Sequence, residues 1–190
     1  INGLPDAIRM GVTSFKMFMT YKKRLSRMCS DTHIATAMQI VGDHGGIVQL
    51  HCENGDVIEY LENKAIAEGR THPRYYPATC PTWAEEEAIN RAILLGAMTD
   101  CPIYVVHLST QGGLERIKRA QNDGQRVWTE TCPQYLLLNE NEMENIGPRA
   151  KIGPPLRPAD MVNQEAMWKG TEQGYISNIG SDHAPASPEE

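Results

Sequence analysis

The chain has 190 residues, of which 41% are hydrophobic and 22% are charged, and its formal net charge is −6. This composition is that of a globular domain with a sizeable core, and the negative charge disfavours non-specific binding to nucleic acid. No apolar run approaches the ~18 residues that a membrane-spanning helix needs, so a membrane partner is not expected.

Short stretches rich in Ile, Val, Thr and aromatic residues predict strands. These stretches cover residues 13–19, 47–52, 103–109, 127–131, 151–153 and 176–180. Helical periodicity between them predicts helices over residues 32–43, 56–68, 84–98, 112–122 and 161–173. Gly69, Gly124 and Gly174 stand where three of these helices should end.

The helix over residues 84–98 shows the clearest periodicity. Its buried face is expected to include Ala88, Ile89 and Ala92, with Glu85 off that face. Just before it, residues 70–83 contain three prolines and predict a long ordered loop.

The alternation of strands and helices predicts an α/β fold with a parallel sheet covered by helices. A doubly wound sheet and a (β/α)₈ TIM barrel both fit this order, but no GxGxxG motif follows any predicted strand, which weighs against a dinucleotide-binding sheet. A full barrel needs about 250 residues. We therefore expect residues 1–190 to form the later part of one catalytic barrel domain, with no second domain.

The five cysteines show no CxxC pair, which argues against a disulfide framework and against a thiolate zinc site. Reduced thiols in a cytoplasmic protein are the expectation. No basic stretch followed by an apolar one marks a secretory signal at the first residues. The chain does not begin with Met, so we expect the start of the protein to lie upstream.

Four polar side chains fall at or near the ends of predicted strands: Lys16, His51, His107 and Asp182. In a barrel the carboxyl ends of the strands meet on one face, where catalysis takes place. Each residue also has an ordinary interpretation. A buried histidine is often a hydrogen-bonded core residue, an aspartate after a strand often caps a helix, and a lysine in an apolar strand often reaches the surface. Their coincidence at successive strand ends favours a shared site.

The four side chains fit a metal site. Neutral imidazole and carboxylate groups suit Zn²⁺ and similar divalent ions. Burial beside cations lowers the pKa of a lysine, and the neutral amine can then add carbon dioxide to form a carbamate that bridges two metals. The other histidines are weaker candidates: His33, His44 and His72 are expected at the surface, and His183 is expected to have a supporting or structural role.

Six segments, in order along the chain, resemble the dihydropyrimidinases and hydantoinases of the amidohydrolase superfamily. SFKMFMTYK (14–22) resembles the carboxylated-lysine strand, and LHCENG (50–55) resembles the next strand and its turn. VVHLS (105–109) resembles the strand that carries the last histidine ligand. ETCPQYL (130–136) and GPPLR (153–157) resemble two substrate-side segments, and GSDHAP (180–185) resembles the last barrel strand with its catalytic aspartate.

The resemblance implies roles for these residues. Two divalent metal ions, expected to be zinc, would be bridged by carbamylated Lys16, with His51 and His107 as ligands of the second metal. Asp182 would bind the first metal, act as a base on the bridging hydroxide and then as an acid toward the leaving nitrogen.

Two further residues would contact substrate. Tyr21, five residues after Lys16, matches a family tyrosine that donates to the carbonyl oxygen as it becomes an oxyanion. An ordinary strand-end aromatic is the alternative, and the spacing favours the functional role. Gly153 stands where the family usually has a serine that binds substrate largely through its backbone, so this departure bears on the native substrate.

Two parts of the family pattern are not found in these residues. The His-x-His pair that completes the first metal site is expected upstream, and the asparagine that reads the ring amide is expected beyond residue 190.

The implied function is reversible hydrolysis of a cyclic imide or ureide, such as a dihydropyrimidine or a 5-substituted hydantoin, to an N-carbamoyl amino acid. The enzyme alternative is an allantoinase, against which the pair of Lys16 and Tyr21 argues. A non-catalytic scaffold related to dihydropyrimidinase is the alternative from another class, although such relatives have generally lost metal ligands. Family relatives are usually homotetramers.

Overall fold

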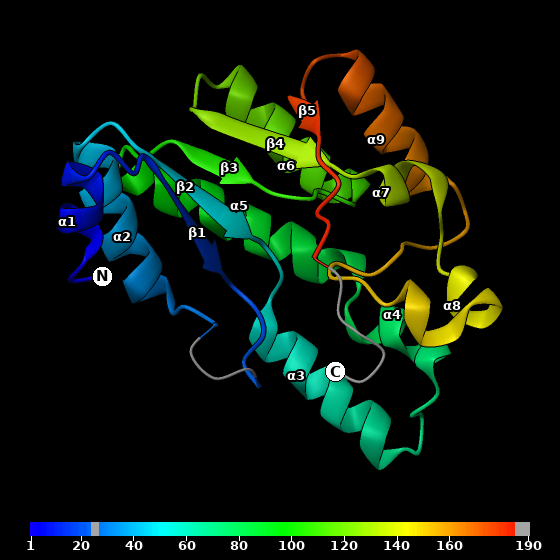
Figure 1. Cartoon of the computed structure of the whole chain (residues 1–190). Helices are drawn as coiled ribbons and strands as arrows, with labels where there is room; N and C mark the ends of the chain where they lie inside the picture. Colours follow the sequence, from blue (N-terminus) through cyan, green and yellow to red (C-terminus); the bar gives the residue numbers. More distant parts are fainter. Residues whose placement is uncertain (24–26, 185–190) are drawn as a thin grey trace.

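The computed structural model describes residues 1–23 and 27–184 (Figure 1). The strands are β1 (Ser14–Phe18), β2 (Ile47–His51), β3 (Ile103–Val105), β4 (Val127–Thr131) and β5 (Asn178–Ile179). The α-helices are α1 (Leu4–Arg9), α2 (Asp31–Asp43), α3 (Gly55–Ala67), α4 (Tyr76–Thr79), α5 (Thr82–Met98), α6 (Gln111–Asn122), α7 (Pro133–Leu137), α8 (Glu142–Asn145) and α9 (Val162–Glu172). Two 3₁₀ helices are η1 (Pro73–Tyr75) and η2 (Gly147–Ala150).

The strands form one parallel sheet in the order β1-β2-β3-β4-β5, so neighbours in the sheet are also neighbours in sequence. A doubly wound sheet would instead reverse its strand order at a switch point. Helices connect successive strands and lie along the sheet, with α5 and α6 behind its middle (Figure 1). This order is that of consecutive strands in the wall of a barrel.

The two faces of the sheet differ in burial because side chains alternate along each strand. Val48, Leu50 and Val105 are at most 1% exposed and belong to the core that the helices cover. The opposite face, which we call the open face, carries the alternate residues of the strands. It consists of Ser14, Lys16, Phe18, Ile47, Gln49, His51, Tyr104, Trp128 and Glu130. A barrel fills this side with inward-pointing side chains.

Helix caps follow closely after the strand ends. The Asn54 side chain accepts a hydrogen bond from the backbone N–H of Val57 at 3.1 Å and begins α3. Thr110 accepts from the backbone N–H of Gly113 at 3.2 Å and begins α6. Each such cap contributes about 1 kcal/mol to stability. Because the caps lie so near the strand ends, the segments that carry His51 and His107 are short and held on both sides.

The helix ends agree with the sequence. Gly69, Gly124 and Gly174 follow α3, α6 and α9 with φ of +71°, +83° and +78°. A glycine adopts this left-handed conformation without the steric cost of a Cβ, so each one ends its helix where the sequence predicts. All five cysteines are free thiols, as expected, and four of them are buried.

Residues 151–153 do not form the predicted strand. The carbonyls of this stretch accept hydrogen bonds from tyrosine side chains instead: the Tyr76 hydroxyl donates to the Ile152 carbonyl at 2.8 Å, and the Tyr135 hydroxyl donates to the Pro154 carbonyl at 2.6 Å. Pro154 and its neighbour Pro155 have no N–H with which to join a sheet. The segment therefore lies as an irregular loop held by two phenols.

Two other expectations need correction. Glu85 is 1% exposed and lies on the buried face of α5 with Ala88 and Ile89, although the charge pattern predicts it off that face. The predicted loop at residues 70–83 contains η1 and α4, and α5 begins within it at Thr82. In the ranges that the structure describes, no helix is long and apolar enough to cross a membrane.

Candidate metal centre

Two imidazole rings lie together at the carboxyl end of the sheet. His51 is the last residue of β2, and His107 lies two residues beyond β3 with a positive φ of 44°. Both residues are 2% exposed, and their ring centroids are 4.3 Å apart at an interplanar angle of 70°. The adjacency of β2 and β3 thus brings together two residues that are far apart in sequence.

Both rings are held in the neutral form. Burial lowers the pKa of His51 to about 3, and the positive charges of Lys16 and Arg157 add to the effect. Burial also lowers the pKa of His107 well below its ordinary value, with further contributions from His51 and Lys16. A neutral imidazole has a lone pair on one ring nitrogen, which is the form that binds a metal.

His107 has an unsatisfied ring nitrogen. Its Nδ1 atom is buried and finds no hydrogen-bond partner within residues 1–23 and 27–184. Buried polar atoms in folded proteins nearly always have a partner, so an orphaned one indicates a missing ion, water or ligand. Together with the neutral His51 ring beside it, this atom fits a cation site.

Lys16 occupies the open face of β1, at the position opposite Gln49. Its ammonium lies 5.2 Å from the centroid of the Phe18 ring. Burial by surrounding atoms lowers the pKa of this lysine, although the negative charge of Asp182 opposes the shift. The lowered pKa increases the fraction of neutral amine, which is the form able to take up carbon dioxide.

Asp182 follows β5 by three residues, with a positive φ of 47°, in an exposed position. The protein atoms that partly surround its carboxyl raise the pKa of Asp182, the positive charge of Lys16 opposes this shift, and the charge of Glu130 adds to it. Lys16 and Asp182 each shift the pKa of the other, so their side chains lie within electrostatic range of each other. Pro185, the last residue of the 180–185 motif, lies outside the described residues.

The tyrosine and glycine of the predicted substrate site are in contact with the histidines. The Tyr21 ring packs edge-on against His51 with centroids 5.0 Å apart. A Cβ placed on Gly153 would lie 2.5 Å from the Tyr21 hydroxyl oxygen and 3.8 Å from Cε1 of His51. The absence of a side chain at Gly153 therefore lets the Tyr21 hydroxyl approach the backbone of the 153–157 segment closely.

The six predicted site residues thus lie on the open face or near the carboxyl end of the sheet, but they do not form a preformed metal cage. Among the residues that the structure describes, no group of three or more His, Cys, Asp or Glu side chains is close enough to hold a metal ion. Lys16 does not count toward such a group as an amine. It would become an oxygen ligand only as a carbamate, so its chemical state decides how complete the ligand set is.

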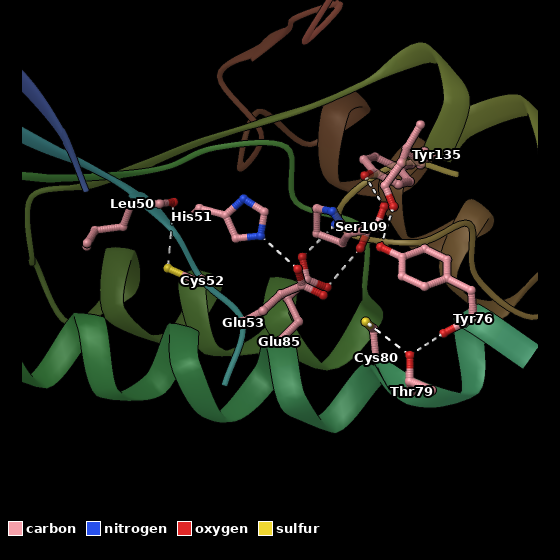
Figure 2. Close-up of polar contacts among 12 residues, drawn as sticks. Leu50, His51, Cys52, Glu53, Tyr76, Thr79, Cys80, Glu85, Ser109 and Tyr135 are labelled. Atoms are coloured by element: carbon pink, nitrogen blue, oxygen red, sulfur yellow. Dashed lines mark hydrogen bonds and ion pairs between the residues drawn. The ribbon is translucent and has the colours of Figure 1, made fainter. Parts of the chain in front are cut away.

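Glu53 contacts His51 and is not among the site residues that the sequence predicts. Its carboxyl Oε2 lies within hydrogen-bonding distance of His51 Nε2, at 2.7 Å, and both side chains are buried (Figure 2). Burial raises the pKa of Glu53 to about 7, and the positive charge of Arg157 opposes this shift. The sequence signal for it is its place in the LHCENG segment, two residues after the strand-end histidine.

A buried ion pair lies beside this contact. Arg157 donates from Nη2 to Glu85 Oε2 at 3.2 Å, from Nη1 to the Cys80 carbonyl at 2.7 Å and from Nε to Ser109 Oγ at 2.9 Å. Ser109 in turn donates to Glu85 from its backbone N–H at 3.1 Å and from its hydroxyl at 2.9 Å. The pair joins the 153–157 segment to α5 and to the loop after β3.

We expect Arg157→Met to destabilise the protein by about 3–5 kcal/mol, because it leaves the Glu85 carboxylate buried without its counter-ion. The double variant Glu85→Leu with Arg157→Met should recover most of the loss, since it removes both charges. Urea unfolding of the single and double variants measures the difference. Equal destabilisation of the two would show that packing, and not the unpaired charge, accounts for the effect.

A polar network lies on the open face and joins three neighbouring strands. The Tyr104 hydroxyl donates to Glu130 Oε2 at 3.0 Å or to Asn178 Oδ1 at 2.8 Å, and the Asn178 amide donates to Glu130 Oε2 at 3.3 Å. The network ties together β3, β4 and β5, and it holds the Glu130 carboxylate within electrostatic reach of Lys16 and Asp182.

Sequence comparison shows that this chain is similar to one part of several longer enzymes. The D-hydantoinase of Geobacillus stearothermophilus is 39% identical over 183 residues, which is 94% of this chain and 38% of that protein. The allantoinase of Escherichia coli O9:H4 (strain HS) is 34% identical over 194 residues, which is 100% of this chain and 42% of that protein. The chain thus spans about two fifths of the length of these curated relatives. No protein-family model matches it.

Structure comparison agrees. The crystal structure of dihydropyrimidinase from Brevibacillus agri NCHU1002 is 39% identical, with a TM-score of 0.92 over 97% of this chain and 40% of that chain. Equally high scores are found for structures of D-hydantoinases, so the predicted fold, part of a hydantoinase-type (β/α)₈ barrel, is confirmed.

Proposed function

We propose that this chain, a homologue of D-hydantoinases and dihydropyrimidinases, carries part of the active site of a metal-dependent cyclic amidohydrolase. The reaction is hydrolytic opening of a cyclic imide or ureide, such as a dihydropyrimidine or a 5-substituted hydantoin, to the N-carbamoyl amino acid. The observation that supports the proposal is the placement of four side chains: Lys16 lies on the open face of β1, His51 ends β2, and His107 and Asp182 follow β3 and β5.

The residues would hold two divalent cations, with zinc the expected metal. His51 and His107 offer neutral imidazoles, Lys16 would bridge as a carbamate, and Asp182 offers a carboxylate. Bound divalent cations lower the pKa of water and polarise carbonyl oxygens, which is the chemistry that hydrolysis of an amide needs.

Asp182 would move the proton of the reaction. Its carboxylate accepts a proton from the attacking water as the water oxygen bonds to the ring carbonyl carbon. It then delivers this proton to the ring nitrogen as the carbon–nitrogen bond breaks. One side chain thereby acts as base and then as acid, a role that contributes about 10²–10⁴ to the rate.

Tyr21 and Gly153 would bind the substrate. The Tyr21 hydroxyl donates to the ring carbonyl oxygen as it gains negative charge, and the backbone at Gly153 contacts the ring. Because the Tyr21 hydroxyl lies close to Gly153, the hydroxyl and the Gly153 backbone would contact a substrate in the same region beside His51.

Replacing Tyr21 with Phe should lower kcat by about 10²–10³ with a much smaller rise in KM, because the lost donor acts on charge that exists only in the transition state. Steady-state kinetics of the whole protein on dihydrouracil and hydantoin measure both constants. A rise in KM at constant kcat would instead show that Tyr21 binds substrate and transition state equally.

An allantoinase is the second candidate, because the Escherichia coli allantoinase aligns along the whole of this chain. Assays of the metal-loaded whole protein with dihydrouracil, 5-substituted hydantoins and allantoin decide between the two. We expect ring opening of the first two compounds. Turnover of allantoin alone would favour the second candidate, and no turnover of any of them with full metal content would favour a non-catalytic scaffold.

We also propose that residues 1–190 belong to a single catalytic domain and that the whole protein is a homotetramer in the cytoplasm. The free state of all five cysteines supports a reducing compartment. Light scattering of the whole protein tests the assembly.

A further inference from the structure

The contact between His51 and Glu53 is short and isolated from solvent. The distance from His51 Nε2 to Glu53 Oε2 is 2.7 Å, and the two side chains are 2% and 3% exposed. Figure 2 shows the His51 ring pointing from the end of β2 toward Glu53, which lies between that ring and Ser109.

The contact with Glu53 bears on which nitrogen of the His51 ring can bind a metal. A neutral ring has one N–H and one lone pair, on different nitrogens. If Nε2 donates its hydrogen to the Glu53 carboxylate, the lone pair must be on Nδ1. A carboxylate on the far nitrogen of a metal-binding histidine fixes the tautomer and the ring orientation, and it increases the basicity of the ligand.

Glu53 is poorly suited to a purely structural role. Its second carboxylate oxygen, Oε1, is buried without a hydrogen-bond partner in the part of the chain that the structure describes. Burial of a half-satisfied carboxylate costs stability, whereas an apolar side chain of similar size would not carry this cost. The stability cost indicates that the carboxylate serves the His51 ring.

The neighbouring ion pair does not provide Glu53 with a direct partner. The Arg157 guanidinium donates its hydrogen bonds to Glu85, Ser109 and the Cys80 carbonyl. Glu53 Oε2 instead lies 2.7 Å from His51 Nε2, so the carboxyl is oriented toward the His51 ring.

We propose that Glu53 is a positioning residue of the metal centre: its carboxylate holds the His51 ring with Nε2 toward Glu53, so that Nδ1 is presented to a cation. The inference rests on the proposed function, because His51 is assigned there as a metal ligand. Glu53 itself touches neither substrate nor metal in this proposal.

The test is the substitution Glu53→Met in the whole protein, which keeps the length of the side chain and removes the acceptor. We expect the Zn²⁺ affinity of the site that includes His51, measured by competition with a chromophoric chelator, to fall about 10–100-fold. The thermal midpoint of the metal-free protein should stay the same or rise, because a costly buried carboxylate is gone. A structural role predicts the opposite pattern, a lower midpoint with unchanged metal affinity.

Two variants complete the design. Glu53→Gln keeps an oxygen that accepts from His51 Nε2, so its loss of affinity should be smaller than that of Glu53→Met. Cys52→Ala is the matched control, because Cys52 is equally buried but belongs to the core on the other side of the chain. It should lower the thermal midpoint slightly and leave the Zn²⁺ affinity unchanged.

The outcomes separate this inference from the proposed function. Wild-type metal affinity in Glu53→Met, with a wild-type protein that binds zinc and opens rings, would overturn the inference alone. A Glu53→Met protein that does not fold would also overturn it, because Glu53 would then be structural. A wild-type protein that binds no zinc and opens no ring would overturn the proposed function, and this inference with it.

Discussion

Asp182→Asn should bind metal detectably and lose nearly all turnover, with kcat reduced by at least about 10²–10⁴. The amide keeps one oxygen that can contact a cation, but it cannot accept a proton from water and return it to nitrogen. The substitution also preserves the backbone, since Asp182 has a φ of +47° and asparagine tolerates this left-handed conformation as well as aspartate does. Loss of activity would therefore report on proton transfer and not on misfolding.

Asp100→Asn provides the matched control. Asp100 has a similar φ of +49° and is exposed, but it lies just before β3, at the end of the sheet opposite Asp182. Residues at that end of a barrel serve stability and not catalysis. Metal content and kcat of both variants are measured side by side on the whole protein. Turnover of Asp182→Asn within about tenfold of wild type would place the catalytic base elsewhere.

The sheet and its functional end were predictable from sequence because they depend on local patterns. Strand residues alternate between core and open face, and polar residues such as His51 stand where a buried strand stops. Parallel strands in sequential order then bring their carboxyl ends together whatever the sequence between them. This is why His51 and His107, 56 residues apart in number, were expected in one site and lie with ring centroids 4.3 Å apart.

The supporting residues were not predictable because their roles depend on tertiary partners. Glu85 is one of three consecutive glutamates, and although its spacing of three, four and seven residues from Ala88, Ile89 and Ala92 puts it on their face, its charge argued against burial. Its burial becomes possible only because Arg157, 72 residues later, lies against it. A charge pattern along one helix places a glutamate on the surface unless a distant counter-ion is known.

The 151–153 segment shows the same limit for backbone structure. The predicted strand rests on one residue of high β propensity, Ile152, and a strand also needs a neighbour whose N–H and C=O groups are free. Here the Tyr76 and Tyr135 hydroxyls provide the donors, and both come from segments distant in sequence. The approach of the Tyr21 hydroxyl to Gly153 was equally invisible, since it depends on where this irregular loop lies.

Lys16→Ala should abolish stoichiometric metal binding and with it all measurable ring opening. Lys16 lies on the open face of β1 in the electrostatic field of His51, His107 and Asp182, where an unmodified ammonium would repel cations. As a carbamate it would instead supply two anionic oxygens to two metals, formed when the amine adds carbon dioxide and releases a proton. Removal of the side chain removes the only group proposed to touch both cations.

Lys16→Arg should not restore binding, because a guanidinium stays protonated and does not form a carbamate. Lys22→Ala serves as the control. This lysine lies in the segment after β1, pairs on the surface with Asp56 at 2.7 Å and Glu59 at 3.0 Å, and is not proposed to contact metal. It should retain wild-type metal content and activity.

Two measurements test the modification directly. A density map of the metal-loaded whole protein should show Lys16 carrying one added carbon dioxide, and reloading of the metal-free protein should be faster with bicarbonate present. The bicarbonate dependence follows because carbon dioxide is a reactant in forming the ligand. An active protein with full metal content and an unmodified Lys16 amine would contradict the carbamate, and the bridging ligand would then have to come from another residue of the whole protein.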